Sequence, residues 1–328
     1  MVQRKKRDRR RKKKNPILFL ILLNAILWGS GLYLWYLEVS TPTVPGDEGS
    51  TGQRWTYDTL VTRLPDFNET HAFAPYEVDV QLGSANVLLI NLSTNEVIFS
   101  QNARARAYPA SLTKIMTVLL GIEHATDDEL TVVADFNELF LEGAAMAGFI
   151  YGETRTLDEV LHGTMLPSGA DATSTLAHHI SGSYEGFIAL MNEKAREIGM
   201  EDTHFMNASG LHHPEHYSTA MDMAILFRHA LQYEQFRQII TTESYDIVLG
   251  DGRSHTMFNT MNLLMFDTMF LGGEILGGKD GYTHEALWCL ASLATDGIDE
   301  YILITMNAEQ LHGHIFDAFD AYEYFLNR

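Results

Sequence analysis

Apolar and polar residues follow different spacings in successive parts of this 328-residue chain. Between residues 84 and 102, two apolar runs are separated by the polar sequence "STNE", which predicts a β-hairpin. From about 126 to 240, apolar positions recur at intervals of three and four residues, as is typical of helices. The apolar runs between 276 and 308 predict strands again, around the turn "TDGID".

Two further helices complete the predicted elements. Residues 111–122 have a helical pattern, and the last stretch places Leu311, Ile315, Phe319 and Tyr322 on one face of a closing amphipathic helix. Strands therefore precede and follow a long helical insertion. This order predicts an α+β fold in which the N- and C-terminal strands share one antiparallel sheet.

Residues 16–37 form an uncharged and strongly apolar stretch, preceded by ten Lys or Arg and one Asp in residues 1–14. The stretch has the length of a transmembrane helix. A basic segment on one side and Trp and Tyr residues at the other end predict that residues 1–15 are a cytoplasmic tail and that the remainder lies outside. A cleaved signal peptide is the competing interpretation, although no small-residue cleavage site follows the stretch cleanly.

The sequence after this anchor divides into a linker and a domain. Residues 38–77 include a segment rich in Pro, Gly, Ser and Thr, which predicts a flexible tether. Residues 78–328 are then the folded domain, and 46% apolar residues in the whole chain are enough for a sizeable core.

The charge and the cysteine content exclude some classes of function and structure. Beyond residue 14 the chain has 13 basic and 42 acidic residues, so this part would repel phosphate and is not expected to bind nucleic acid. The single cysteine, Cys289, excludes an intramolecular disulfide and lies in an apolar run, where we expect it to be a core residue.

The sequence "YPASLTKIMT" (residues 108–117) places Ser111 three residues before Lys114 at the expected start of a helix. Side chains at this spacing share one helix face. The free N–H groups of a first helical turn favour an alkoxide or oxyanion. Burial favours the neutral form of a lysine, which can then accept a serine proton. A capping serine beside a lysine that reaches solvent is the simpler interpretation, and this motif alone leaves both open.

Two later segments carry polar groups suited to a cleft. "LPSGAD" (residues 166–171) is a turn between two helical stretches that can present Ser168. "LGGKDGYT" (residues 276–283) places Lys279 on a strand, where Gly281 leaves room for a ligand near the backbone. A cationic strand edge suits an anionic substrate tail. Each segment alone is also consistent with an ordinary loop or strand.

Together, these segments resemble the superfamily of penicillin-binding proteins and serine β-lactamases, in which Ser-x-x-Lys, a Ser-Gly turn and Lys-x-Gly occur in this order. "YPASLTKIMT", "MNEKAREIGMEDTHFMNASGLHHPEHYSTAMDMA" and "GGKDGYTHEA" are more similar still to the D-alanyl-D-alanine carboxypeptidases, the low-molecular-mass penicillin-binding proteins. The resemblance covers roughly residues 80–328. It implies a fold like that of the β-lactamases and transpeptidases.

The resemblance also implies a role for each candidate residue. Ser111 would form an acyl-enzyme, with Lys114 as its base and Ser168 as a proton relay. The segment Lys279, Asp280, Gly281 and Tyr282 would bind the substrate, with Lys279 balancing its charge. The backbone N–H groups of Ser111 and Tyr282 would form an oxyanion hole.

The implied substrate is a peptidoglycan stem peptide ending in D-Ala-D-Ala. β-Lactams would be inhibitors that acylate the same serine, and no metal or organic cofactor would be needed. With the predicted anchor, the expected protein is a single-pass cell-membrane enzyme whose catalytic domain is extracellular.

Two positions depart from the family's motifs. Ala170 stands where the second motif ends in Asn, and Asp280 replaces the Thr of Lys-Thr-Gly, whose hydroxyl is thought to help bind the terminal carboxylate. At about 4 Å, two carboxylates repel by roughly 1 kcal/mol in water and by about 4 kcal/mol at a partly shielded site. A weakened protein that binds wall peptides without efficient turnover is therefore an alternative, as is a substrate lacking the free carboxylate.

The sequence "HHPEH" (residues 212–216) raises a third possibility, because it matches the His-x-x-Glu-His pattern of inverted zinc proteases. That pattern needs a helix to bring His212 and His216 onto one face, and Pro214 disfavours a helix there. A loop is the favoured interpretation, with a zinc peptidase as a remote alternative.

Overall fold

The computed structural model describes residues 80–133, 144–261 and 268–327 of the chain. The basic tail, the apolar stretch 16–37 and the linker 38–77 lie outside the described residues, so the predictions made for them stay predictions. In the ranges that the structure does describe, no helix has both the length and the apolar character needed to cross a membrane.

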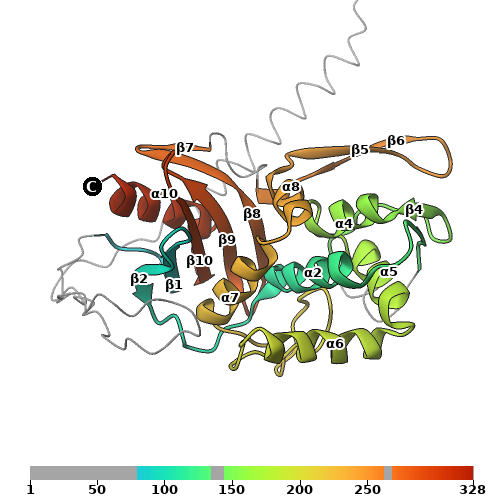
Figure 1. Ribbon diagram of the computed structural model, residues 1–328, viewed down its shortest axis with the longest axis horizontal. Coiled ribbons are helices and arrows are strands. Elements are labelled where there is room, and N and C mark those ends of the chain that lie inside the picture. Colours follow the sequence, from blue (N-terminus) through green and yellow to red (C-terminus); the bar gives the residue numbers. More distant parts are fainter. Residues whose placement is uncertain (1–79, 134–143, 262–267, 328) are drawn as a thin grey trace, which may run out of the picture. The chain divides into compact units, whose positions relative to one another are not determined.

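Six antiparallel strands form the main sheet (Figure 1). In chain order they are β1 (Ser84–Asn91), β2 (Glu96–Gln101), β7 (Met269–Phe270), β8 (Gly273–Thr283), β9 (Leu287–Thr295) and β10 (Glu300–Ala308). Their spatial order is β2-β1-β10-β9-β8-β7, so early and late strands pair directly, with Leu89 of β1 opposite Leu303 of β10. The predicted α+β fold with one shared antiparallel sheet is confirmed.

The central strands are buried on both faces. In β1, Leu88 and Ile90 pack in the core that includes the helical region, whereas Val87 and Leu89 pack with the closing helix α10 (Gly313–Leu326). This alternation follows from the two-residue period of a strand. Because both faces are covered, the sequence shows a continuous apolar run and no alternation of apolar and polar residues.

The helical region lies between β2 and β7 in the chain and surrounds one buried helix. Its α-helices are α2 (Lys114–His124), α4 (Leu157–Met165), α5 (Ala170–Ser181), α6 (Tyr184–Glu197), α7 (Ala220–Ala230) and α8 (Glu234–Thr241). Two two-stranded antiparallel sheets, β3 (Glu129–Thr131) with β4 (Thr154–Thr156) and β5 (Ser244–Val248) with β6 (Ser254–Phe258), belong to the same region. Helix α2 contacts α4, α5, α6, α7 and α8 (Figure 1), which explains why residues 114–121 are all buried.

The closing helix is attached to the start of the first strand by a buried carboxylate. Asp317 of α10 accepts hydrogen bonds from the backbone N–H groups of Gly83 and Ser84, both at 2.7 Å, and from the Ser84 hydroxyl at 2.5 Å. Hydrogen bonds to an ionised group are stronger than neutral ones. The two ends of the described domain are therefore joined by side-chain contacts as well as by the sheet.

Two details differ from the predicted elements, and the prediction for Cys289 is confirmed. The stretch 276–295 is interrupted at His284–Ala286 and forms two strands, β8 and β9. Leu311 precedes α10 and is half exposed, whereas Ile315 and Tyr322 are buried on the helix as predicted. Cys289 is fully buried in the core, as expected.

Candidate active site

A cavity of about 160 Å³ lies where the start of α2, the turn before α5 and strand β8 meet. It is lined by all seven residues that the sequence singled out: Ser111, Lys114, Ser168, Lys279, Asp280, Gly281 and Tyr282. Ser209, Gly210, Thr260 and Thr283 also line it, and sequence reasoning missed them. The fold thus brings three separate motifs into one place.

Ser111 lies in a 3-10 turn, η1 (Ala110–Thr113), that precedes helix α2. The predicted helix began at Ser111, but the α-helix itself starts at Lys114. Ala110 has a positive φ of 47°, a conformation that costs a non-glycine residue free energy and is frequent at functional sites. This turn sets the position of the Ser111 side chain and of its backbone N–H.

Two glycines flank the Ala110–Ser111 peptide. A Cβ atom at Gly281 of β8 would lie 2.7 Å from the Ser111 nitrogen, and one at Gly210 would lie 1.8 Å from the Ala110 carbonyl oxygen. Both separations are shorter than contacts that real Cβ atoms make. Only glycine therefore allows strand β8 and the 207–211 loop to approach the turn this closely.

Lys114 is buried directly beside Ser111. Its Nζ atom lies 3.3 Å from Ser111 Oγ and donates a hydrogen bond of 2.6 Å to the Ser209 carbonyl oxygen. That carbonyl is positioned by Asn207, whose Oδ1 accepts from the Gly210 N–H at 2.7 Å. The amine is thus within reach of the Ser111 proton, which is the geometry required of a general base.

Ser168 faces the same cavity from the turn between α4 and α5. It has a positive φ of 63°, and its buried hydroxyl has no hydrogen-bond partner among the described residues. An unsatisfied buried hydroxyl is costly, and it commonly indicates a bound ligand or water as the missing partner. The turn that the sequence predicted is therefore present, and it presents Ser168 as expected.

Lys279 and Asp280 form a buried ion pair on β8, with Nζ and Oδ1 3.1 Å apart. Burial by itself would raise the pKa of Asp280, but the Lys279 charge and the hydrogen bonds from Thr260 and Lys279 outweigh it and hold that pKa below its ordinary value. Asp280 is therefore ionised in the folded domain, which the sequence could not establish. Thr260 donates its hydroxyl proton to the same Oδ1 atom.

Tyr282 follows this pair at the edge of the cavity. Its side chain is 48% exposed, and its ring lies 4.6 Å from that of Trp288 on β9. This contact between aromatic rings favours the observed position of the exposed side chain. The backbone of Tyr282 is adjacent to Gly281 and hence close to the Ser111 turn.

The backbone at Ala144 and Ala145 forms another part of the cavity wall, and Asp171 helps to hold the residues that follow it. The Asp171 carboxylate accepts from the backbone N–H groups of Ala147, Gly148 and Phe149 at 2.7, 2.9 and 3.0 Å. In addition, the Ala170 N–H donates to the Ala145 carbonyl oxygen at 2.8 Å. An acidic residue in the first turn of a helix is favourable by itself, so the sequence did not reveal that Asp171 binds the distant backbone at residues 147–149.

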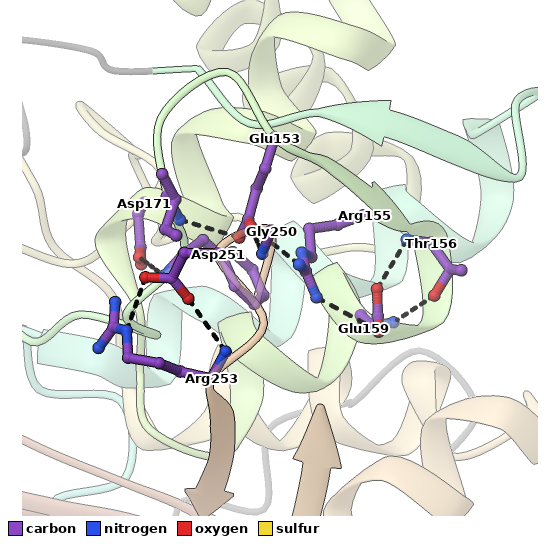
Figure 2. A network of polar contacts seen from close by, with 10 residues as sticks. Glu153, Arg155, Thr156, Glu159, Asp171, Gly250, Asp251 and Arg253 are labelled. Carbon is purple, nitrogen blue, oxygen red and sulfur yellow. Dashed lines mark hydrogen bonds and ion pairs between the residues drawn. The ribbon is translucent and has the colours of Figure 1, made fainter. Parts of the chain in front are cut away.

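The same polar network continues to the β5–β6 hairpin (Figure 2). Glu153 accepts from the Gly250 N–H at 2.6 Å and pairs with Arg155 at 2.8 Å. Arg155 also lies 3.6 Å from Glu159. These contacts attach the hairpin and strand β4 to the wall of the cavity.

The histidine cluster at residues 212–216 is a loop and not a helix, as Pro214 predicts. His216 is buried, and burial, followed by the charges of nearby histidines and Lys114, lowers its pKa to about 3. Its Nδ1 accepts from the Met206 N–H at 3.1 Å, so Nε2 carries the proton and donates to Thr113 Oγ1 at 2.8 Å. Both nitrogens therefore serve to hold the loop beside η1, and the described residues contain no cluster of three or more metal-ligating side chains.

Comparison with known proteins identifies one family. The sequence model of the D-alanyl-D-alanine carboxypeptidases matches residues 70–310. D-alanyl-D-alanine carboxypeptidase DacF of Bacillus subtilis is 36% identical over 227 residues, which are 68% of this chain and 57% of that protein. D-alanyl-D-alanine endopeptidase of Escherichia coli is 30% identical over 246 residues, 73% of this chain and 76% of that protein.

Two solved structures have a fold similar to that of this chain. The DD-transpeptidase of Streptomyces K15 superimposes with a TM-score of 0.69 at 26% identity, covering 76% of this chain and all of that one. An evolved penicillin-binding protein homologue from Mycobacterium tuberculosis gives a TM-score of 0.66 at 28% identity, over 75% of this chain and 92% of that one. The matched region spans about three fifths of the length of the first relatives, DacF and the two DacD carboxypeptidases.

Replacing Asp171 should loosen the cavity wall. In Asp171→Asn, an amide N–H₂ would face backbone N–H groups, so we expect a loss of about 2–3 kcal/mol in the free energy of unfolding. Denaturant unfolding followed by circular dichroism measures this. Asp251→Asn is the matched control, because Asp251 is exposed and its described side-chain partner is the nearby Arg253, and it should leave the midpoint nearly unchanged. Equal effects of the two variants would contradict the anchoring role of Asp171.

Proposed function

The chain belongs to the D-alanyl-D-alanine carboxypeptidase family, and we propose that it is a serine D-Ala-D-Ala carboxypeptidase that trims peptidoglycan stem peptides through an acyl-enzyme on Ser111. The observation that carries this proposal is the position of Lys114 Nζ, 3.3 Å from Ser111 Oγ, in a cavity also lined by Ser168, whose buried hydroxyl has no hydrogen-bond partner among the described residues.

Acylation is the first proposed step. Ser111 Oγ attacks the carbonyl carbon between the two D-alanines while its proton passes to the neutral amine of Lys114. The carbonyl oxygen becomes an oxyanion, and the backbone N–H groups of Ser111 and Tyr282 donate to it. Ser168 relays the proton from Lys114 to the leaving nitrogen as the C–N bond breaks, which releases D-alanine and leaves an ester on Ser111.

Hydrolysis completes the cycle. A water molecule loses a proton to Lys114 and attacks the ester carbon, and the same two N–H groups stabilise the second oxyanion. The C–O bond to Ser111 then breaks, the proton returns to Ser111 Oγ, and the shortened peptide leaves with a new carboxyl group. A β-lactam would acylate the same serine through its strained amide.

A protein that binds wall peptides with little turnover remains the second candidate. The observation that favours it is the Lys279–Asp280 ion pair. Asp280 already balances the charge of Lys279 at the place where the substrate would bind. Ala170 also lines the cavity without the side-chain amide that the family motif supplies there. Acylation and product release, measured separately, distinguish the two candidates.

The location of this activity is a separate part of the proposal. The apolar stretch 16–37 would anchor the chain in the cell membrane, with residues 1–15 in the cytoplasm and the catalytic domain outside. The linker 38–77 would then give the domain reach into the cell wall. The support is the charge and hydropathy pattern of the sequence.

Ser111→Ala tests the nucleophile. We expect benzylpenicillin at high concentration to form a covalent adduct on Ser111, seen by intact-protein and peptide mass spectrometry, and the variant to form none. Release of D-alanine from a stem peptide should fall by roughly 10³-fold or more. Ser254→Ala, at an exposed position of strand β6, is the control and should behave like the unchanged chain. An adduct in Ser111→Ala would refute the assignment, and an adduct without cleavage of any peptide between its two D-alanines would favour the binding protein.

Removal of residues 1–37 tests the anchor. The full chain should sediment with membranes through a high-salt wash and be released by detergent, whereas a chain from residue 38 onward should stay in the supernatant. The intact mass of the membrane-bound protein distinguishes an uncleaved anchor from a cleaved signal peptide. A full-length chain in the supernatant of lysed cells would contradict the anchoring proposal.

A further inference from the structure

The ammonium group of Lys279 has protein acceptors for all of its hydrogens. A lysine ammonium has three N–H donors. Nζ of Lys279 lies 2.8 Å from the Asp280 carbonyl oxygen, 3.1 Å from Asp280 Oδ1 and 3.4 Å from Thr260 Oγ1. Lys279 is only 1% exposed. Its donors are therefore occupied within the protein, and its charge is balanced by a neighbour on the same strand.

Asp280 is left as an acceptor at the cavity. Its Oδ1 atom receives both Lys279 and the Thr260 hydroxyl, while Oδ2 has no donor among the residues that the structure describes. The carboxylate is ionised, as shown above, and Asp280 lines the cavity. A carboxylate oxygen without a donor binds an N–H or O–H group and repels a second carboxylate.

No other cation in the described lining replaces Lys279 as a partner for an anion. The lining contains no arginine or histidine, and its second lysine, Lys114, lies beside Ser111 and donates to the Ser209 carbonyl oxygen. A free terminal carboxylate placed next to Asp280 would thus meet a negative oxygen and a cation whose donors are engaged.

We propose that Asp280 makes this site select peptides that carry an amide N–H where a carboxypeptidase substrate carries its free terminal carboxylate. This inference rests on the proposed acylation of Ser111 and specifies its substrate class. The N–H would donate to Asp280 Oδ2. Two sources offer this group: a peptide that ends in a carboxamide, and a peptide chain that continues beyond the scissile bond, as in a cross-link.

Three peptides that differ only at this position test the proposal. Each has the same acyl-D-Ala-D-Ala sequence and ends in a free acid, a carboxamide, or an amide bond to a further residue. With the unchanged domain, kcat/KM for at least one amide-containing peptide should exceed that for the free acid by roughly tenfold or more, mainly through KM. Cleavage at the bond between the two D-alanines is followed by mass spectrometry of both products.

Asp280→Asn and Asp280→Thr are the informative variants. Both remove the negative charge, so kcat/KM for the free acid should rise by about tenfold or more while the carboxamide gains little. Asp251→Asn, outside the cavity, should leave the preference unchanged. Circular dichroism verifies folding, and if the Asp280 variants do not fold, the preference of the unchanged domain decides the question by itself.

Each outcome has a separate meaning. Preference for the carboxamide identifies an amidated peptide end, and preference for the extended peptide identifies an endopeptidase-like substrate. Preference for the free acid overturns this inference and leaves the proposed carboxypeptidase intact. Failure of the unchanged domain to cleave any of the three, or to acylate Ser111, overturns the proposed function and this inference with it.

Discussion

The close approach of strand β8 to the turn that carries Ser111 is the constraint on which the rest of the site depends. Gly281 and Gly210 bring two backbone segments against the Ala110–Ser111 peptide, at separations where a Cβ atom would collide. The central sheet fixes β8, because β8 pairs along its length with β9. Strand β8, held by the sheet, and a strained turn thus place the Ser111 N–H beside the backbone of Gly281, next to Tyr282.

Charge balance within the cavity is the second feature that determines which substrates the site can bind. Sequence reasoning treated Asp280 as a repulsive substitution whose ionisation was unknown. The structure gives it a partner, Lys279, and a hydrogen-bond donor, Thr260, which together keep it ionised despite its burial. The substitution therefore does not leave an uncompensated buried charge, which would be strongly destabilising. Asp280 changes which groups Lys279 can bind. We therefore expect a different substrate preference in a site that stays folded.

The sequence allowed most of the fold to be predicted, because its strands and helices differ clearly in apolar spacing and the motifs stand in a familiar order. It also indicated Ser111, Lys114, Ser168 and the four residues from Lys279 to Tyr282, since each of these lies in a motif. It could not indicate Thr260, Ser209 or Asp171, whose roles depend on contacts with segments distant in sequence. The 3-10 turn at Ser111 escaped prediction for a similar reason, because packing against Gly210 and Gly281 decides it and local propensity does not.

The measurement that tests this account most directly is the rate constant for acylation of Ser111 in Gly281→Ala, followed with a saturating β-lactam by quenched-flow mass spectrometry. A methyl group at this position would displace the Ser111 N–H from β8, so we predict a rate at least about 10²-fold lower in a domain that remains folded by circular dichroism. Gly83→Ala is the control, because its new Cβ atom would make an ordinary contact at 3.7 Å. Acylation of Gly281→Ala at the unchanged rate would contradict the central claim.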